Sequence, residues 1–407
     1  MTLSWRASCR GCGGAPEDFL SLGEQPLANR LRKAGESVDV ARYSLTLCRC
    51  TSCDLVQLRE VVDPAMMFAD YLYVPSTSST MVAHFDALAG EAVTRLGLGS
   101  DSLVIDVGSN DGLLLSRFRE RGVRVSGIEP AENLAARANA SGIPTTCAFL
   151  DVSVARELAS QGKASLVCAT NVFAHVDDIR GFMRAAFELL DDHGVFLVEV
   201  QSWADTVATL AFDMTYHEHL TYYATSPLAR VCREEGLVLL DVDRVTTHGG
   251  SLRAWIGRPG HRLNRPERVA ERVALESPFV GPSASARFAK GAHGVRDQLR
   301  ALLAAIRNDG GRVAAYGAPA KATVLLNFCD LGPTDVAYVV DRNEAKQGHW
   351  IPGAEIPIVG PSRLAADPPT HLLLLAWNLA DEIMAEQASL RRAGGAFILP
   401  VPVPRIV

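Results

Sequence analysis

"LVIDVGSNDGLLLSRF", residues Leu103–Phe118, is the stretch that decides the fold. Its apolar first part, "LVIDV", predicts a buried strand. The turn "GSNDG" then leads into a helix that we expect to begin near Leu113. Asp106 lies near the carboxyl end of that strand, where open α/β sheets bind ligands. Gly108 and Gly112 allow the backbone to approach a ligand closely.

The sequence on both sides of this stretch alternates between strand-like and helical runs. Strands are predicted in "VRVSGIEP", "ASLVCATNVFAHVDD" and "GVFLVEV", and helices in Asp63–Leu96, "AENLAARANA" and "RGFMRAAFELL". This order predicts a parallel sheet with helices on both faces. Glu129 ends the second strand, as does the acid that holds ribose hydroxyls in nucleoside-binding folds. The glycine spacing is not G-x-G-x-x-G, so a dinucleotide fingerprint fits less well.

After about Leu263 the α/β pattern begins again. A long helix is predicted over Arg287–Asn308, followed by "GRVAAYGAPAKATVLLNF" and by strands in "VAYVVD", "THLLLLAW" and "GAFILP". This predicts a second Rossmann-like unit. We therefore expect an α/β protein of three domains, with boundaries at 1–62, 63–262 and 263–407.

Five of the nine cysteines lie in the first 53 residues. "CRGC" and "CTSC" contain the pairs Cys9 with Cys12 and Cys50 with Cys53, and two C-x-x-C pairs can complete a tetrahedral zinc site. Cys48 is a spare thiol that could compete with Cys50. The four-ligand site is closed, so we expect the zinc to support folding rather than catalysis. A nucleic-acid-binding zinc ribbon is the alternative.

Composition limits the possible partners. The chain has 407 residues, 48% hydrophobic and 21% charged, with a formal net charge of −6. This balance argues against a polyanion as the main partner, and we expect no nucleic acid. No apolar run approaches the length of a membrane span, and the N-terminus lacks the pattern of a signal peptide. We therefore expect a cytoplasmic protein, with no membrane partner and with thiols and metal rather than disulfides.

"DMTYHEHL", Asp213–Leu220, places Tyr216, His217, Glu218 and His219 side by side. Four proton-handling side chains are poor material for a core. The H-x-H spacing suits a strand rather than the helix of a metal-binding H-E-x-x-H motif, so catalysis is favoured over metal binding. A solvated loop is the remaining interpretation.

The strand, turn and acid around Gly108 resemble motif I of class I S-adenosylmethionine-dependent methyltransferases. The resemblance implies that the cofactor is S-adenosylmethionine and that its site includes the following residues: Asp106, Gly108, Asn110, Asp111, Glu129, Phe149, Leu150 and Asn171. A methyl donor beside a cluster of bases favours a carbon nucleophile. A carbon acid beside a carbonyl needs both a strong general base and donors for the developing enolate.

The whole chain resembles the nucleotide-sugar C-methyltransferases of deoxysugar biosynthesis. The motifs that carry the resemblance are "CRGC…CTSC", "DYLYVPSTSST", "IDVGSNDG", "NVFAHVDD", "YHEHLTYY", "HGGSLR", "YGAPAKATVLLNF" and "VVDRNEAKQG". The family resemblance implies an N-terminal zinc-binding domain, a methyltransferase core and a C-terminal α/β domain. It also implies methylation of a dTDP-4-keto-deoxysugar at C-3, with C-5 as the alternative, in antibiotic deoxysugar biosynthesis.

The same resemblance implies roles for individual residues. His219 would be the base, supported by Glu218, with Tyr216, His175 and Tyr71 at the sugar; we favour Tyr71 over Tyr73. The substrate-binding set implied by the motifs is Tyr73, Tyr222, His248, Ser251, Arg253, Tyr316, Lys321 and Lys346. The basic members of this set are candidates for contacts with the diphosphate, because a diphosphate needs cations and backbone amides.

Three other functions compete with this hypothesis. An O-methyltransferase acting on a small natural product would need neither the base cluster nor a second α/β unit. A zinc-ribbon nucleic-acid-binding protein would show salt-sensitive binding, which the charge balance disfavours. An oxidoreductase would use the C-terminal unit. We favour the sugar C-methyltransferase, expect a monomer, and expect the sugar to lie between the second and third domains.

Overall fold

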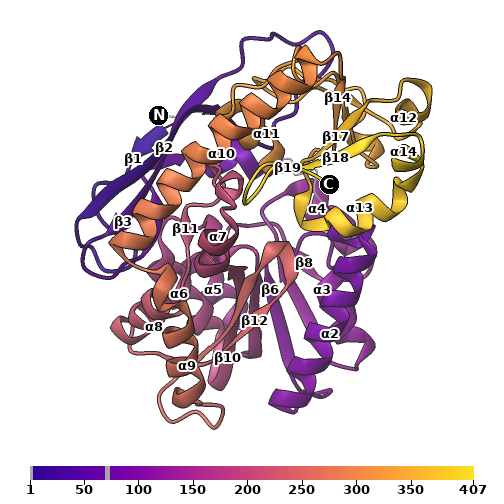
Figure 1. Ribbon diagram of the computed structural model, residues 1–407. Coiled ribbons are helices and arrows are strands. Elements are labelled where there is room, and N and C mark those ends of the chain that lie inside the picture. The colour runs from indigo at the N-terminus through magenta and orange to yellow at the C-terminus, as the bar shows by residue number, and fades with distance from the viewer. Residues whose placement is uncertain (1–2, 69–73) are drawn as a thin grey trace.

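The structure is a computed structural model that describes residues 3–68 and 74–407, without the side chain of His248. Tyr71 and Tyr73, both predicted at the sugar, lie outside these described residues. Within the described part, sheets of four, seven and six strands form, and a short ribbon pairs β1 (Leu3–Trp5) with β5 (Glu60–Val62). Figure 1 shows the N-terminal strands and the C-terminal unit above the large central sheet.

The central sheet has the strand order β12-β13-β10-β9-β6-β7-β8. Its strands are β6 (Leu103–Val107), β7 (Arg124–Ile128), β8 (Thr145–Thr146), β9 (Ala164–Thr170), β10 (Leu190–Gln201), β12 (Val238–Val245) and β13 (Ser251–Gly257). In this described sheet β13 runs antiparallel to both neighbours. The predicted parallel pairing is confirmed for β6, β7, β9 and β10. It does not extend to β13, because residues 246–250 are too few for a crossover between parallel strands.

Helices cover both faces of the central sheet. They are α2 (Ser79–Leu96), α3 (Leu113–Glu120), α4 (Glu132–Ala140), α5 (Val152–Ala159), α6 (Ile179–Leu189), α8 (Thr225–Glu234) and α9 (Pro266–Glu276). Successive strand residues point to opposite faces. Ile105 and Val167 accordingly join a core with α5, α6 and α8, whereas Val104 and Leu166 join a separate core with α2 and α3. The predicted α/β alternation is confirmed for this part of the chain.

The N-terminal sheet is antiparallel, and the cysteine pairs lie at one end of it, before β2 and at the end of β3. Its strands, in the order β11-β4-β3-β2, are β2 (Pro16–Pro26), β3 (Arg42–Cys50), β4 (Val56–Leu58) and β11 (Thr221–Tyr222). The strand predicted for "YSLTLCRC" is confirmed as β3. The edge strand β11 comes from the segment directly after Tyr216, His217, Glu218 and His219, which we call the tetrad. The tetrad is therefore attached to the N-terminal sheet.

The C-terminal sheet has the order β16-β15-β14-β17-β18-β19. Its strands are β14 (Val313–Tyr316), β15 (Val339–Val340), β16 (Ile358–Val359), β17 (His371–Leu374), β18 (Ala396–Leu399) and β19 (Arg405–Ile406), and all but the last pair in parallel. Its helices are α10 (Pro282–Asn308), α11 (Ala320–Phe328), α12 (Ser362–Ala366), α13 (Ala380–Glu386) and α14 (Ala388–Arg392). The predicted second α/β unit is confirmed.

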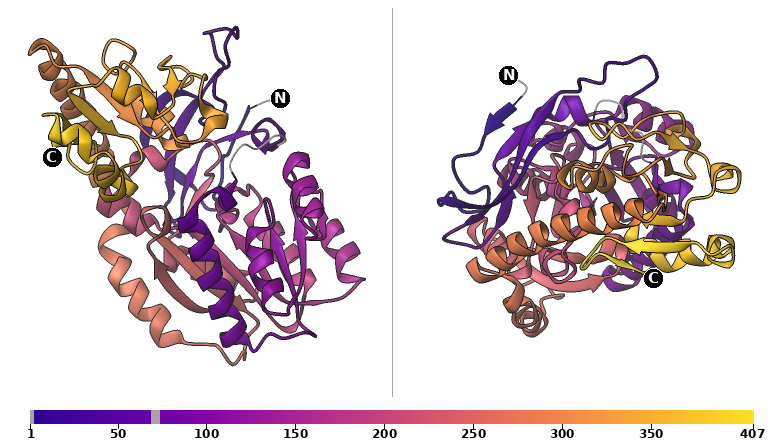
Figure 2. Two further views of the ribbon diagram at one scale, coloured as in Figure 1. Left: turned by 90° about the vertical axis from the view of Figure 1, so that its right-hand side faces the viewer. Right: turned by 45° about the horizontal axis from the view of Figure 1, so that its top comes forward.

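The N-terminal sheet and the C-terminal unit share one hydrophobic core. Leu45 and Leu47 of β3 belong to the same buried cluster as Phe288 of α10 and Leu325 of α11. Phe212, from the segment that precedes the tetrad, is also a member. Figures 1 and 2 show α10 lying along the N-terminal strands. The tetrad segment therefore packs with the two terminal units, while the predicted cofactor turn belongs to the central sheet.

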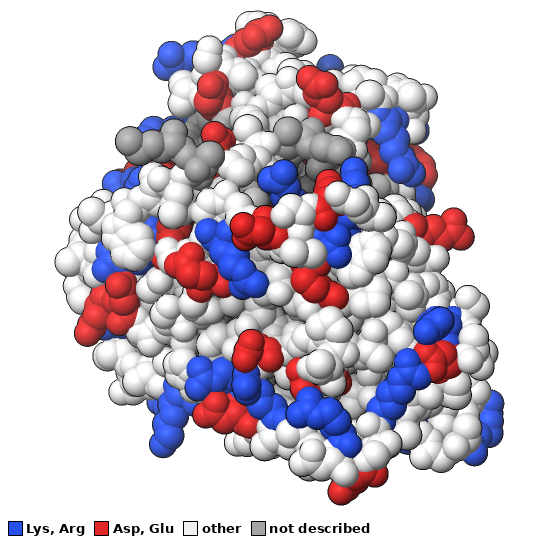
Figure 3. Space-filling model, turned by 90° about the horizontal axis from the view of Figure 1, so that it is seen from above, with Lys and Arg blue, Asp and Glu red and all other residues white. Residues whose placement is uncertain are grey.

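The surface agrees with the nearly balanced composition. On the face in Figure 3, acidic and basic side chains are interspersed rather than gathered into a field of one sign. Within the described ranges, every helix is too short or too polar to cross a membrane.

Candidate active site

The turn after β6 has the geometry that the sequence predicted for a ligand site. Gly108 has φ +67°, and a Cβ added there would lie 2.4 Å from Cγ2 of Val172. Only glycine fits both this left-handed backbone and this close contact. Gly112, at φ +81°, is the N-cap of α3. The turn therefore holds the backbone of residues 108–112 against the carboxyl edge of the sheet.

Glu129, at the end of β7, organises the same turn. Its Oε2 accepts a hydrogen bond from the Asn110 amide at 2.8 Å, and its Oε1 accepts one from the Ala131 amide at 2.9 Å. Burial raises the pKa of Glu129. Burial, with the nearby charge of Glu129, also raises the pKa of Asp106 well above its ordinary value. The two acids form an electronegative, largely desolvated edge.

This edge has the donors and acceptors that S-adenosylmethionine needs. Oδ1 of Asp106, Oγ of Ser109 and Oδ1 of Asp111 are buried and accept or donate no hydrogen bond among the described residues. A ligand with an amine and hydroxyl groups would satisfy them. Phe149 is 53% exposed, unusual for a large aromatic side chain and suited to cover by an adenine ring. The residues present therefore fit the cofactor.

Two further predicted cofactor residues lie beside this edge. Asn171, directly after β9, adopts φ +58°, and its amide donates to the carbonyl of Glu199 at 2.7 Å. Leu150 is half-buried against the core that contains α5 and α6. Both residues lie near the predicted cofactor edge, and their contact with the cofactor stays a prediction.

The tetrad lies in a turn, not in the strand that the H-x-H spacing suggested. A one-turn helix, η3 (Phe212–Met214), precedes it, and the His219 amide donates to the Tyr216 carbonyl at 2.8 Å. The strand expectation is wrong because this bond reverses the chain before β11 begins. The turn separates the two imidazoles: Nε2 of His217 lies 3.0 Å from the carbonyl of Ser44, on the N-terminal sheet.

His219 is held in one tautomer. Its Nδ1 lies 3.0 Å from the carbonyl of Met214. A carbonyl only accepts, so Nδ1 carries the hydrogen and Nε2 carries the lone pair of the neutral ring. The carbonyl of Met214 therefore fixes this tautomer. This arrangement prepares Nε2 to take a proton.

Aromatic rings surround His219. The Tyr216 ring centroid lies 3.9 Å from that of His219, and the His175 ring stacks on it at 5.2 Å with an interplanar angle of 17°. Phe68 also stacks on His175, with the ring centroids 5.4 Å apart. His175 comes from η2 (Phe173–His175), directly after β9. The structure therefore brings together three of the side chains that the sequence singled out, His219, Tyr216 and His175.

Burial lowers the pKa of His175 to about 4 from its ordinary value near 6.5. As the pH falls, the unfolded chain binds this proton first, so the free energy of unfolding falls between pH 6.5 and about 4. We expect His175→Phe, which keeps a stacking ring, to lose less stability than the wild type across this window. Urea unfolding at a series of pH values measures the free energy of unfolding of both proteins. If this free energy changes with pH by the same amount in the two proteins, the prediction is contradicted.

The C-terminal unit reaches the tetrad segment through a buried polar cluster. Nε1 of Trp377 donates to Oδ2 of Asp213 at 2.7 Å. Nζ of Lys321, at the start of α11, lies 3.7 Å from the Trp377 ring and donates to Asn378 at 2.5 Å. Burial lowers the pKa of Lys321 to about 8. The sequence analysis assigned no role to Asp213 or Trp377. The only signal for Asp213 was its position three residues before the tetrad.

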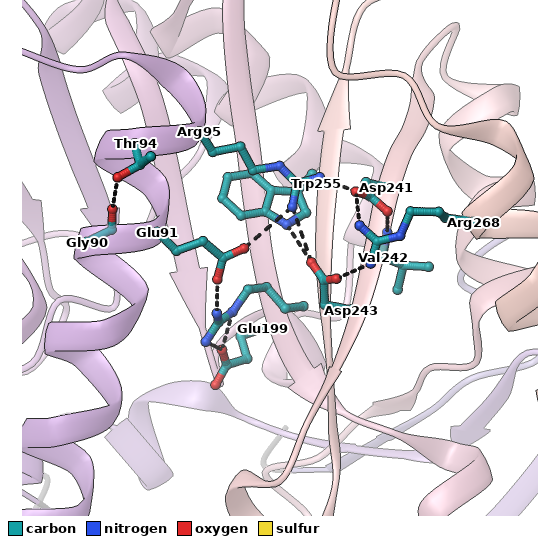
Figure 4. A network of polar contacts seen from close by, with 11 residues as sticks. Gly90, Glu91, Thr94, Arg95, Glu199, Asp241, Val242, Asp243, Trp255 and Arg268 are labelled. Carbon is teal, nitrogen blue, oxygen red and sulfur yellow. Dashed lines mark hydrogen bonds and ion pairs between the residues drawn. The ribbon is translucent and has the colours of Figure 1, made fainter.

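Arg253, a predicted substrate contact, belongs to a network of ion pairs. Its partners Glu91 and Glu199 are labelled in Figure 4. Its guanidinium donates to the buried carboxylate of Glu199 at 3.0 and 3.1 Å, and to Glu91 at 2.6 Å. Nε2 of His84 lies 2.6 Å from the other Glu199 oxygen. The network continues through Arg95 to the acids of β12. The charge of Arg253 is therefore already balanced by two carboxylates.

Four further predicted substrate residues, Tyr222, Ser251, Tyr316 and Lys346, are buried or half-buried. The hydroxyls of Tyr222 and Tyr316 are buried without a hydrogen bond among the described residues. Ser251 donates to the carbonyl of Thr247 at 3.1 Å, and Nζ of Lys346 donates to the carbonyl of Ala318 at 2.8 Å. No described contact decides which of them meets a substrate, and their substrate roles stay predictions.

The four predicted zinc ligands converge. The sulfur atoms of Cys9, Cys12, Cys50 and Cys53 all lie within 4.8 Å of one another. A tetrahedral site with Zn–S bonds of about 2.3 Å places its sulfurs about 3.8 Å apart, so the donor set fits zinc. Cys48 lies outside this set and donates to the carbonyl of Gln57 at 3.3 Å. The choice of Cys50 over Cys48 is confirmed.

Comparisons with known proteins match this architecture. Family models described as "Putative zinc binding domain", "Methyltransferase domain" and "C-methyltransferase C-terminal domain" match residues 9–68, 81–242 and 246–402. The chain is 36% identical over 404 residues to the C-methyltransferase NovU of Streptomyces niveus, covering 98% of this chain and 96% of NovU. It is 24% identical over 159 residues to a ubiquinone biosynthesis O-methyltransferase of Methylobacterium sp. (strain 4-46), covering 36% of this chain and 63% of that protein.

Solved structures share only part of the fold. The magnesium protoporphyrin IX methyltransferase ChlM of Synechocystis PCC 6803 with bound SAH aligns at a TM-score of 0.35 and 14% identity, over 47% of this chain and 91% of ChlM. So low a score adds nothing to the assignment, which depends on the full-length relative and on the fold described above. With its four-cysteine cluster, its class I core and its C-terminal α/β unit, the chain belongs to the family of S-adenosylmethionine-dependent C-methyltransferases.

Proposed function

We propose that this enzyme methylates a dTDP-4-keto-deoxysugar at C-3, in the biosynthesis of a deoxysugar for an antibiotic. Similarity to a C-methyltransferase over nearly the whole chain supports carbon as the acceptor. The observation that carries the proposal is the imidazole of His219, held at Nδ1 by the Met214 carbonyl and packed against the rings of Tyr216 and His175. Such a base suits a proton made acidic by an adjacent ketone.

The reaction then follows from the side chains. When bound, S-adenosylmethionine supplies an electrophilic methyl group on a sulfonium sulfur. Nε2 of His219 takes the proton from C-3, and the electron pair moves into the C-3–C-4 bond as the ketone becomes an enolate. Tyr216 and the neutral His175 donate hydrogen bonds to the enolate oxygen. The enolate carbon would then take that methyl group, the new carbon–carbon bond replacing the methyl–sulfur bond with the neutral thioether as leaving group, and His219 leaves the step protonated.

The nucleotide end of the substrate is proposed to lie at the C-terminal unit. The N-terminus of α11 presents backbone amides, and Lys321 and Lys346 lie at this edge of the C-terminal sheet. Helix N-termini and lysines are suited to phosphates. We also propose that residues 1–62, 63–262 and 263–407 act as the zinc-binding, methyl-donor and nucleotide units. The sugar then spans the central sheet and the tetrad turn.

The proposal is tested with purified enzyme, S-adenosylmethionine and a panel of dTDP-4-keto-deoxysugars. Mass spectrometry should show the gain of one methyl group, and NMR should place it on C-3. Without the methyl donor, in deuterated water, the enzyme should exchange the C-3 proton for deuterium faster than the uncatalysed sugar does. A methyl on C-5 would redirect the proposal to that carbon, and a methyl on oxygen would overturn the enolate mechanism.

Replacing Glu129 with alanine should weaken S-adenosylmethionine binding by about 10- to 100-fold. The substitution removes the carboxylate expected at the ribose hydroxyls, and one hydrogen bond to a charged group contributes about 1.5–3 kcal/mol. It also removes the acceptor that holds the amides of Asn110 and Ala131. Isothermal titration calorimetry measures the dissociation constant. Glu132→Ala, at an exposed position on α4, is the matched control. Equal affinity of the two variants would remove Glu129 from the cofactor site.

A further inference from the structure

We propose that Asn29, from the N-terminal unit, is a positioning residue for the catalytic carboxylate of Glu218. Nδ2 of Asn29 donates a hydrogen bond to Oε1 of Glu218 at 2.7 Å, between residues 189 positions apart in the chain. The atom that faces Glu218 is the amide nitrogen of Asn29, which only donates, so the carboxyl oxygen accepts. This inference deepens the proposed function, since it rests on Glu218 acting beside His219.

Asn29 is itself fixed by the C-terminal unit. The carbonyl of the preceding residue, Ala28, accepts from Oγ1 of Thr323 on α11 at 3.0 Å. Three residues further on, Arg32 pairs with Glu355 at 2.6 Å and exchanges two backbone hydrogen bonds with Trp350. The Arg32 guanidinium also lies 4.6 Å from the centre of the Trp350 ring. These contacts hold the loop of residues 27–32 against the C-terminal unit, while the side-chain amide of Asn29 contacts Glu218 of the tetrad.

The hydrogen bond from Asn29 favours one charge state of a buried acid. Glu218 is only 4% exposed, and burial by itself favours the neutral form of a carboxyl group. A hydrogen bond donated to the carboxylate favours the ionised form and fixes its plane. An ionised Glu218 next to His219 stabilises the imidazolium that forms when the base takes a proton. Asn29 would therefore act on the reaction through Glu218 and need not touch the sugar.

Replacing Asn29 with aspartate gives the sharpest test. A second carboxyl group at this contact makes the pair share one proton, which raises the pKa of the pair. We expect kcat to fall by about 100-fold at pH 7 and the acidic limb of the kcat–pH profile to move up by about one unit or more. Asn29→Ala, which removes the donor without adding a charge, should lower kcat by about tenfold, without that shift.

Two controls separate positioning from a loss of folding. Asn264→Asp makes the same chemical change at an exposed turn and should leave kcat and its pH profile as in the wild type. S-Adenosylmethionine binding, measured by calorimetry, should be unchanged in all variants because its predicted site lies on the central sheet. A wild-type pH profile for Asn29→Asp would overturn the proposal, as would equal losses without a shift in both Asn29 variants.

A double-mutant cycle in stability makes the test independent of turnover. Asn29→Asp should lose stability relative to wild type as the pH rises from 4 to 7, because the folded pair has a raised pKa. Adding Glu218→Gln, which removes one of the two carboxyl groups, should abolish most of that loss. If the wild type methylates no sugar in the panel, the proposed function fails, and so does the catalytic role of Asn29. The cycle then still decides whether the Asn29–Glu218 contact exists.

Discussion

Replacing His219 with asparagine should lower the rate of C-methylation by about three orders of magnitude. The imidazole is the general base of the proposed reaction, and a positioned base contributes on the order of 10²–10⁴ in rate. Asparagine retains a side-chain donor that can reach the carbonyl of Met214 but has no lone pair of comparable basicity. The same variant should therefore also lose deuterium exchange at C-3.

The measurement is initial-rate kinetics by mass spectrometry, with deuterium exchange in parallel. S-Adenosylmethionine should still bind, because the predicted cofactor edge lies on β6 and β7 and not in the tetrad turn. His193→Asn, at an exposed position of β10, is the matched control and should keep wild-type rates. Full activity of His219→Asn would exclude it as the base. Lost methylation with normal exchange would place its role after deprotonation.

Removing the metal should have the second large effect. Simultaneous replacement of Cys12 and Cys50 by serine should abolish zinc binding, and the N-terminal unit should lose its fold. Structural zinc sites contribute about 10–16 kcal/mol of apparent binding free energy at neutral pH, which exceeds the stability of most domains. Elemental analysis of the wild type should find one zinc per chain. The variant should contain none and unfold at a lower temperature or aggregate.

The loss of zinc should also lower methylation activity, because the metal cluster is connected to the active site through Arg10. Arg10, between two of the ligands, donates from Nε to Asp177 at 2.9 Å and from Nη1 to the carbonyl of Leu58 at 2.6 Å. Asp177 follows η2, which carries His175. Methylation should therefore fall together with the metal content on chelation and return when zinc is restored. Cys147→Ser, at an exposed thiol outside the cluster, is the control. Undiminished activity of a zinc-free protein would contradict this coupling.

Most of the fold could be predicted from local sequence patterns. The apolar strand, the glycine turn and the acid at the end of the next strand are contiguous features, and they predicted β6, α3 and β7 where the structure has them. The two C-x-x-C pairs predicted the metal cluster, because their spacing already places two sulfurs on one ion. The prediction was wrong where local residues do not decide the outcome: at β13, whose direction depends on the connection before it, and at the tetrad, where a hydrogen bond reverses the chain.

The sequence by itself determined the elements, the metal ligands and the types of side chain available for catalysis, because these depend on neighbours within a few residues. The tertiary structure alone decided which side chains meet. It stacked His175 on His219, placed Met214 at Nδ1, and brought Asn29 to Glu218 across 189 positions. It also joined the N-terminal sheet to the C-terminal unit in one core. Such contacts depend on how the apolar faces of helices and sheets pack. The local spacing of apolar residues predicts a buried face, but it does not predict which other face that face packs against.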